Sequence, residues 1–168
     1  MSAETFTTAL FLITAIIAAG VLINAVFPVV YQMSGTFSSA THESDERMRT
    51  DIKIVATYGN TGGVAQVYFK NIGTTRIALS QIRKGDVFFG PTGTFTRLTN
   101  KASLPLGDDQ WYANLIDDNS NEFWDAGETL EIDATTSSTP LSVGDTVYFQ
   151  FVLPNGVWRS TEFSVVSA

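Results

Sequence analysis

Residues 117–128 are the part of this chain whose residue types and spacing suggest chemistry. They read DDNSNEFWDAGE, so side-chain oxygens recur at alternate positions before a glutamate in the twelfth place. Alternating oxygen donors suit a hard cation, because every second side chain can turn toward the ion. The spacing therefore predicts a calcium (Ca2+) site. Its predicted ligands are the side chains of Asp117, Asn119, Asn121, Asp125 and Glu128 and the main-chain carbonyl of Phe123.

The loop departs in two ways from the EF-hand, the calcium loop that its spacing follows. Glu122 occupies the position at which an EF-hand needs glycine for a sharp turn. The flanking segments, 111–116 and 129–133, have the pattern of strands instead of helices. An acidic hairpin loop without an ion is therefore the alternative interpretation. The charges favour the ion, because several carboxylates in one loop repel one another unless they are neutralised.

The remaining composition argues against an enzyme. The chain has no cysteine and one histidine, His42, so neither a Cys nucleophile nor a Ser–His–Asp set is credible. The formal net charge is -7, and all ten Lys and Arg residues lie at or after Arg47 without forming a basic cluster. We therefore expect neither nucleic acid nor a small-molecule substrate as partner. A membrane-anchored hydrolase is the class that the sequence supports least.

A long apolar segment precedes the elements that must position this loop. Residues 6–33 read FTTALFLITAIIAAGVLINAVFPVVYQM, and no charged side chain occurs between Glu4 and Glu43. A membrane-spanning helix needs about 20 apolar residues, and residues 9–30 supply that length. We expect residues 1–33 to form a helix in a membrane or in the core of a filament. Pro28 is expected to kink or end it.

Two other interpretations of this segment fit less well. A secretory signal would carry Lys or Arg before its apolar run and a cleavage site after it, and neither is evident. A buried helix of a soluble protein would be shorter and less uniformly apolar. A lipid bilayer and a bundle of like helices both favour this apolar composition, so the sequence leaves these two environments open.

Residues 34–50 form a polar segment between the apolar helix and the rest of the chain. Its first part, SGTFSSAT, is small and polar, and is interpreted either as a hinge or as a continuation of the helix. The charged residues that follow place opposite charges four residues apart, which favours a solvated helix. We expect a polar stalk at 34–50 and a head domain at 51–168.

From residue 51 the hydrophobic period becomes two, the pattern of β-strands. Asn155-Gly156 is the strongest hairpin signal and predicts a type I′ turn, in which both residues have positive φ. Short strands at intervals of about 8–12 residues indicate a β-sandwich. The expected fold class is α+β, a long apolar helix followed by an all-β head. The predicted strands are 51–58, 64–71, 76–82, 86–89, 94–98, 111–116, 129–133, 145–153 and 157–166.

This layout resembles the FlaG family, the stator proteins of the archaellum (the archaeal flagellum). The resemblance spans nearly the whole chain. It is carried by the segments SAETFTTALFLITAIIAAG, RMRTDIKIV, YFKNIGTTRI, DVFFG, FWDAGETLEI and FVLPNGVWRSTEF. FlaG proteins are in turn related to archaellins and type IV pilin-like proteins. The resemblance implies an immunoglobulin-like sandwich for the head.

The resemblance also implies a non-catalytic structural role. FlaG proteins look like stator components that work with a FlaF-like partner, self-assemble and contact the surface-layer protein. The implied location is the archaeal cell membrane, with the head in the pseudo-periplasm. The cations nearest the apolar helix, Arg47, Arg49 and Lys53, taken alone would place the head in the cytoplasm. They lie more than a dozen residues beyond the span, so we follow the resemblance.

The chief alternative is a filament subunit of the archaellin or type IV pilin type, which polymerises through its N-terminal helix. Such subunits are made with a basic leader before the apolar helix, and no leader is visible in this sequence. This difference favours a stator. In both cases we expect a homo-oligomer or filament in which the helices associate and the heads make the outer contacts.

Overall fold

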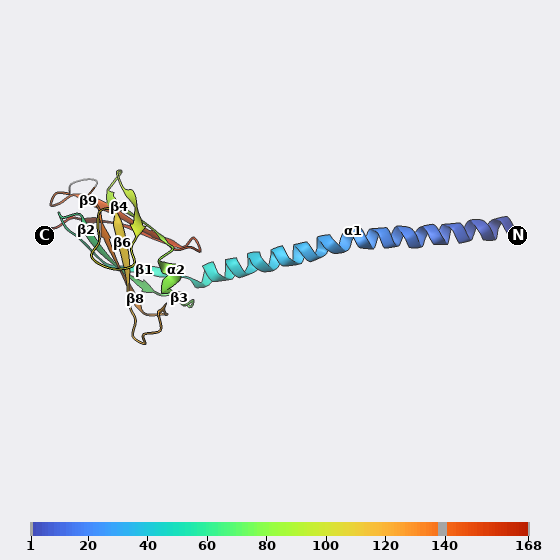
Figure 1. Ribbon diagram of the computed structural model, residues 1–168, viewed down its shortest axis with the longest axis horizontal. Helices are drawn as coiled ribbons and strands as arrows, with labels where there is room; N and C mark the ends of the chain where they lie inside the picture. Colours follow the sequence, from blue (N-terminus) through green and yellow to red (C-terminus); the bar gives the residue numbers. More distant parts are fainter. Residues whose placement is uncertain (1, 138–140, 168) are drawn as a thin grey trace. The chain divides into compact units, whose positions relative to one another are not determined.

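The computed structural model describes residues 2–137 and 141–167, and begins with one continuous helix, α1 (Ser2–Arg49), seen in Figure 1. Pro28 was expected to kink or end the helix; it lies inside α1, so the helix does not end there. A proline removes one backbone hydrogen bond and crowds one carbonyl, yet the chain is helical on both sides of Pro28. The segment 34–41 is likewise helical, so it is not a break in secondary structure.

The chain divides into two compact units, one running to Ser44 and the other beginning at Asp45. The polar segment 34–50 is therefore divided between them: residues 34–44 belong to the helical unit and residues 45–50 to the head. No described residue of α1 is buried. Glu4 near its beginning and Arg47 and Arg49 near its end complement the partial charges of the helix termini.

The head is built from short strands and one helical turn (Figure 1). Its strands alternate inward apolar and outward polar residues, as in β2, where Ala65, Val67 and Phe69 are fully buried. The elements are β1 (Ile52–Gly59), β2 (Val64–Asn71), β3 (Ile77–Ala78), α2 (Leu79–Ile82), β4 (Asp86–Pro91), β5 (Thr96–Asn100), β6 (Gln110–Ile116), β7 (Phe123–Trp124), β8 (Thr129–Thr135), β9 (Thr146–Val152) and β10 (Trp158–Ser164).

The strands form one eight-stranded sheet in the order β1-β2-β8-β6-β5-β4-β9-β10, with a separate β3-β7 pair. Neighbouring strands are antiparallel except β5 and β6, which pair in parallel over two positions. The sheet folds over at this short parallel pair to give two layers. At the opposite side Asn60 bridges to Val166, so the ends of the sheet also meet. The predicted sandwich is confirmed, with a nearly closed, barrel-like outline.

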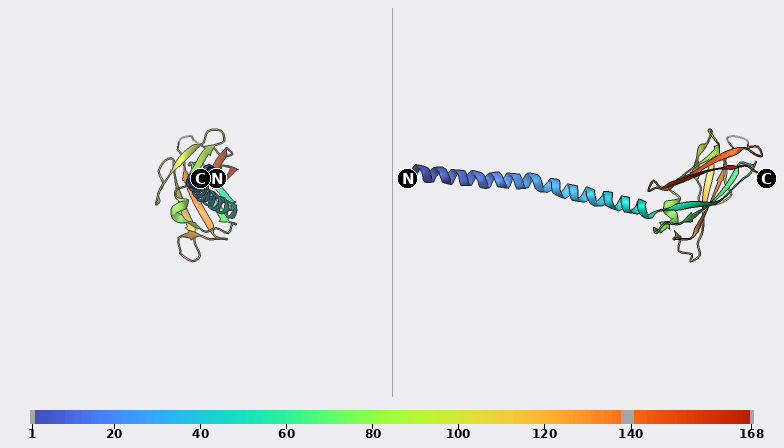
Figure 2. Two further views of the ribbon diagram at one scale, coloured as in Figure 1. Left: turned by 90° about the vertical axis from the view of Figure 1, so that its right-hand side faces the viewer. Right: turned by 180° about the vertical axis from the view of Figure 1, so that it is seen from behind.

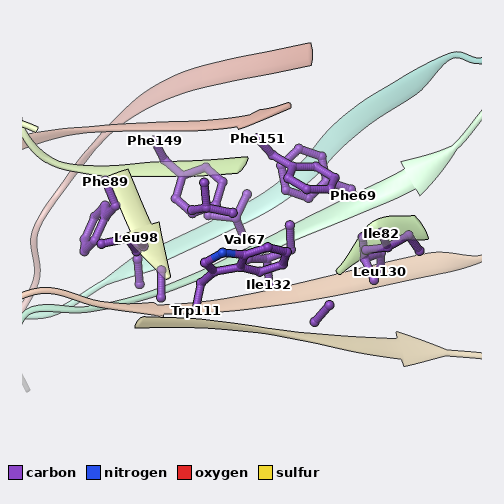
Figure 3. Packing of buried hydrophobic residues seen from close by; sticks show 14 of the residues in the cluster. Val67, Phe69, Ile82, Phe89, Leu98, Trp111, Leu130, Ile132, Phe149 and Phe151 are labelled. Atoms are coloured by element: carbon purple, nitrogen blue, oxygen red, sulfur yellow. The ribbon is translucent and has the colours of Figure 1, made fainter. Parts of the chain in front are cut away.

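The core lies between the two layers (Figure 3). Aromatic rings dominate it: Phe69 of β2 packs against Phe149 and Phe151 of β9, with ring centroids 6.1 and 5.4 Å apart. The ring centroids of Trp111 of β6 and Phe151 lie 6.0 Å apart, and Trp111 is 1% exposed. Large buried aromatic side chains contribute much of the free energy of burial in a domain of this size.

Two local predictions for the head were wrong, and one short strand was not predicted. The segment 76–82 is not one strand, because after β3 the chain turns into α2, which buries Ile82. The alternation expected for residues 51–58 is broken by a β-bulge between Ile54 and Ala56, and most residues after it are exposed. The short strand β7 lies inside the acidic loop. It was not predicted, because two residues are too few to show apolar alternation.

The last hairpin, β9–β10, forms at Asn155-Gly156 as predicted but with a different turn (Figure 2, orange to red). Of this pair, only Gly156 has positive φ, at 83°. The amide of Gly156 donates to the carbonyl of Leu153 at 2.9 Å, and the amide of Leu153 donates to Val157. This is a three-residue loop with glycine in the left-handed position, so the predicted type I′ turn was wrong.

Candidate functional site

Residues 117–128 form the loop between β6 and β8. These two strands are paired antiparallel up to Ile116 and Thr129, so the loop is flanked by strands as predicted. Its middle is held separately, because β7 pairs with β3 through Ile77 and Trp124. The loop is therefore anchored at both ends and once in between.

The carboxylate of Asp117 holds the first half of the loop together by hydrogen bonds. Its carboxylate accepts backbone N–H bonds from Asn119, Ser120 and Glu122 at 2.8 to 3.0 Å. Ser120 and Glu122 have positive φ, 56° and 61°, so Glu122 adopts the left-handed conformation for which an EF-hand uses glycine. Partial desolvation raises the pKa of Asp117, but the N–H donors outweigh it and hold this pKa below its ordinary value.

Asp125 closes the second half of the loop. Its Oδ2 accepts hydrogen bonds from the amides of Asn121 at 2.8 Å and Asn119 at 3.3 Å. These amides, foremost Asn121, lower the pKa of Asp125, and Arg76 at 3.4 Å lowers it further. The guanidinium of Arg76 also lies 4.3 Å from the centre of the Phe123 ring, a cation–π contact.

Glu128, expected in the twelfth place as a bidentate ligand, is 9% exposed. Its Oε2 accepts the backbone N–H of Asp125 at 2.8 Å, and its carbonyl accepts the indole N–H of Trp124 at 2.9 Å. Because Trp124 is fully buried, these bonds tie the end of the loop to the core. Glu128 thus has a structural role in the loop whether or not a cation binds.

The loop is held by its own hydrogen bonds, and most of the predicted ligand oxygens take part in them. Among residues 2–137 and 141–167, no three or more Asp, Glu or His side chains form a group that could hold a metal ion. A cation would have to displace several of these bonds, as well as the Arg76 pair. The calcium site therefore stays a prediction.

Asn71, the last residue of the predicted strand 64–71, is a fully buried polar residue at the end of β2. Its side-chain amide donates to the carbonyls of Thr75 and Trp124, each at 2.9 Å. Its side-chain oxygen accepts the N–H of Gly73 at 3.0 Å, and its backbone amide donates to the carbonyl of Glu128. An Asn-X-Gly triplet directly after an apolar strand was the available signal for this arrangement.

The last residue of α1 and the residues that follow it are held by main-chain hydrogen bonds to residues 72–75. The carbonyl of Arg49 accepts from Thr74 and Thr75, and the carbonyl of Asp51 accepts from Ile72 and Gly73. Gly73 is required by close approach, because a Cβ there would meet the carbonyl oxygen of Arg49 and, at 2.5 Å, the amide nitrogen of Asp51. No local pattern in the sequence predicted this junction.

Side chains of the β9–β10 hairpin strengthen the same junction. The amide of Asn155 donates to the hydroxyl of Thr50 at 3.0 Å, and this hydroxyl donates to the carbonyl of Glu46 at 2.7 Å. Arg159 pairs with Asp51, with 2.6 Å between Nη2 and Oδ1. Residues separated by more than a hundred positions are therefore joined where the head begins.

The apolar part of α1 is the other functional feature of the chain. In the part of the chain that the structure describes, α1 is the one helix long and apolar enough to cross a membrane by length and composition. Its apolar side chains are exposed throughout residues 6–33, including Leu10, Ile16 and Val30. Such a surface requires an apolar environment, either lipid or other helices.

Comparison with known proteins identifies the family. A family model of archaeal-type flagellin matches residues 2–163, which is nearly the whole chain. The chain belongs to the archaeal-type flagellin family. It is 29% identical over 169 residues to a protein of Archaeoglobus fulgidus described as uncharacterized, across 98% of this chain and 99% of that one. The expectation of an archaellum-related protein is thereby confirmed.

Solved structures share the fold of this flagellin-family chain. The archaellum periplasmic stator protein FlaG from Sulfolobus acidocaldarius is 23% identical with a TM-score of 0.53, over 68% of this chain and 99% of that chain. A complex of the stator proteins FlaF and FlaG from the same organism is 22% identical with a TM-score of 0.54, over 67% of this chain and 87% of that chain. The archaeal flagellum of Methanospirillum hungatei strain JF1 is 15% identical with a TM-score of 0.52, over 92% of each chain.

The flagellin-family head also carries an aromatic cluster on its outer face. Phe88 of β4, Phe95 and Tyr148 of β9 form it, with ring centroids 6.4 Å apart for Phe88–Phe95 and 4.7 Å apart for Phe95–Tyr148. Phe95 is 45% exposed. Exposed aromatic clusters are typical of contact surfaces between proteins. The signal was present in DVFFG, where strand alternation turns Phe88 away from the core and Phe89 into it.

Proposed function

We propose that this chain is a FlaG-like stator component of the archaellum. The observation that carries the proposal is the match to the Sulfolobus FlaG chain, of which 99% is covered at 23% identity. The filament structure is matched at 15% identity. The proposed role is structural and non-catalytic, since the head devotes its buried polar groups, such as Asn71, to holding loops in place.

In the proposed arrangement, residues 6–33 of α1 anchor the protein in the archaeal cell membrane. The head then lies in the pseudo-periplasm, where it contacts a FlaF-like partner and the surface-layer protein. The FlaF–FlaG complex supports a partner of this kind, because its structure has the same fold. The aromatic cluster of Phe88, Phe95 and Tyr148 offers an outer contact surface, since partly exposed aromatic rings provide large contact area.

A filament subunit is the second candidate, and a different observation favours it. The Methanospirillum flagellum chain is matched over 92% of its own length and 92% of this chain, so helix and head are both included. In that role α1 would pack against other copies of itself in the filament core, and the exposed apolar surface of α1 would be covered by protein instead of lipid.

Localisation separates the two roles. Filaments are sheared from cells, and the filament and envelope fractions are probed with an antibody against the head. The organism's main archaellin serves as filament marker and an integral membrane protein as envelope marker. Signal that follows the envelope marker, together with loss of motility on deletion while filaments still assemble, is the expected result.

Strong signal along sheared filaments would instead assign the chain to the filament and overturn the stator proposal. A second experiment tests the partner surface. Phe95→Ser is compared with Thr94→Ser, a neighbouring substitution that leaves the aromatic cluster intact. Co-purification of the head with the FlaF-like protein is expected to fall for Phe95→Ser alone.

A further inference from the structure

The last strand of the head, β10, is a free edge of the sheet. It pairs with β9 in an unbroken register, and it contains neither a proline nor a β-bulge. At the other end of the sheet, β1 carries a bulge between Ile54 and Ala56. In the described part of the chain, β1 and β10 (teal and dark red in Figure 2) share one bridge, between Asn60 and Val166. A regular edge of this kind is a template for pairing with another extended chain.

The direction of the main-chain groups shows which residues of β10 are available. In an antiparallel pair, alternate residues direct their N–H and C=O groups toward the neighbouring strand, and the residues between direct them away. The carbonyl of Val157 and the amide of Val165 are both bonded to residues that flank β9, so odd-numbered residues face β9. The amide of Val166 donates in the opposite direction, to β1. The main-chain groups of Trp158 and Ser160 therefore point to the unpaired edge.

An open pocket of about 650 Å³ lies at the same edge, within the head unit that begins at Asp45. Trp158 and Ser160 line it from β10, and the last residues of α1 line it from the other side. Its size falls within the usual range of binding pockets, about 300–1,000 Å³. Two of its apolar side chains, Trp158 and Met48, are 52% and 82% exposed. The residues whose main chain is unpaired thus also form one wall of a pocket with exposed apolar surface.

The pocket carries an excess of positive charge in a chain whose formal net charge is -7. Its lining contains two arginines, Arg47 and Arg159, and one carboxylate, Asp51. Arg159 donates to Asp51 at 2.6 Å and to the carbonyl of Trp158 at 2.8 Å, so the five N–H groups of its guanidinium are not all used. A carboxylate brought by a partner would meet further N–H donors in an arrangement that suits guanidinium–carboxylate pairing.

The free main-chain groups and the charge together indicate what kind of molecule covers this edge. A strand added to a sheet edge bonds through its own main chain, so unpaired groups on β10 fit an extended peptide. Neighbouring side chains of a strand point to opposite faces, so a carboxylate can turn toward Arg159 while the next side chain lies against Trp158. A sugar or a phosphate would leave the strand edge unpaired. Two arginines in the pocket disfavour a basic segment.

We propose that β10 accepts an acidic, extended segment of a partner protein as an additional strand. The main chain of this segment pairs with Ser160, and one of its Asp or Glu side chains binds between Arg47 and Arg159. An apolar side chain of the same segment contacts Trp158. The site is separate from the aromatic cluster on β4 and β9, and it does not depend on whether the chain is a stator component or a filament subunit.

Peptide binding to the full-length, isotope-labelled protein in neutral detergent micelles tests this site. The probe is the capped peptide Thr-Val-Thr-Glu-Val-Thr. One matched peptide has glutamine in place of glutamate, and another has N-methyl groups on alternate amides. NMR titration and amide hydrogen exchange are the measurements. The glutamate peptide is expected to bind and to slow exchange at the amide of Ser160 several-fold, while the amide of Thr161, which faces β9, changes little. The glutamine peptide should bind several-fold more weakly, and the N-methylated peptide should not bind.

Two arginine variants separate the pocket from general electrostatic attraction. Arg47→Gln removes a charge from the pocket. Arg49→Gln is the matched control, because Arg49 contacts Thr74 and Asp45 outside the pocket. Arg47→Gln is expected to weaken binding of the glutamate peptide up to about fivefold, the range of a partly exposed ion pair. Arg49→Gln should weaken it much less. Thermal melts verify that both variants are folded.

Several results would overturn the proposal. These are no change at millimolar glutamate peptide, equal binding of the N-methylated peptide, or equal effects of the two arginine variants. Glucuronate that shifts the signals of the pocket residues, where the peptide does not, would assign the pocket to an acidic sugar and would also overturn it. None of these results bears on the localisation experiment, so the strand-addition site and the stator role stand or fall separately.

Discussion

The side-chain amide of Asn71 donates a hydrogen bond to the main-chain carbonyl of Trp124, 2.9 Å away and 53 positions later in the chain. Both residues are fully buried. The bond joins the end of β2 to β7, which lies in the acidic loop. The residues directly after β2 hold the last residue of α1. One buried amide thus links the acidic loop to the junction at the beginning of the head.

Replacement of Asn71 should therefore destabilise the head strongly. Asn71→Ala removes the side-chain donor from two carbonyl oxygens, and at roughly 1–3 kcal/mol for each buried group the expected loss is about 2–6 kcal/mol of unfolding free energy. Asn114→Ala, which removes an exposed amide bonded to Glu131, is the control and should cost much less. Urea unfolding of the full chain, followed by tryptophan fluorescence, measures both; equal losses would contradict the assigned role of Asn71.

Gly73→Ala should disrupt the junction at the beginning of the head. The added Cβ would fall against main-chain atoms of Arg49 and Asp51, which cannot move without breaking the hydrogen bonds between these segments. Gly107→Ala is a matched control, because its nearest neighbour is the flexible side chain of Gln110 at 3.4 Å. We expect a lower melting temperature for Gly73→Ala and little change for Gly107→Ala. A Gly73→Ala protein that melts like the wild type would refute the close approach.

Asp133 gives a pH-dependent prediction. Burial raises its pKa, the nearby Glu131 adds to the effect, and the amide of Gln66 opposes it. Because the folded pKa lies above the ordinary value of 3.8, protonation of Asp133 favours the fold at low pH, and this contribution is lost as pH rises through the folded pKa. Asp133→Asn should therefore stabilise the head near pH 7.

The expected gain from Asp133→Asn is modest, below about 1 kcal/mol, because solvent screens a half-buried carboxylate. Asparagine keeps an oxygen to accept the bond from Gln66. Thermal melts of both proteins from pH 3 to pH 8 are the measurement. The difference should disappear below the ordinary aspartate pKa, and a constant difference at all pH values would exclude titration as its cause.

The calcium site has a direct thermal test. If residues 117–128 bind calcium, the melting temperature of the wild type should fall when EDTA replaces calcium, since a ligand at a hundred times its dissociation constant adds about 2.7 kcal/mol. Asp117→Ala combined with Asp125→Ala should abolish this difference, and Asp118→Asn should retain it. An identical melt of the wild type in calcium and in EDTA would leave the loop as an acidic hairpin loop.

Local patterns in the sequence were sufficient for the main elements. The apolar segment and the polar residues after it predict α1, and alternation in segments such as 64–71 predicts strands whose inward residues form the core. These signals are periodic and depend on neighbours in sequence, which is why the α+β class and the strand-flanked acidic loop could be predicted. The family resemblance followed from the same segments.

Contacts between distant residues decided the rest. The burial of the Asn71 side chain depends on its hydrogen bond to the carbonyl of Trp124. The short length of β3 depends on its pairing with β7. The parallel pairing of Thr99 and Asn100 with β6 likewise has no local signal. Hydrogen-bond partners of buried polar groups are chosen by three-dimensional packing, so only the tertiary structure shows them. The sequence by itself determined the helix, the strands and the family; the tertiary structure decided how loops and junctions are held.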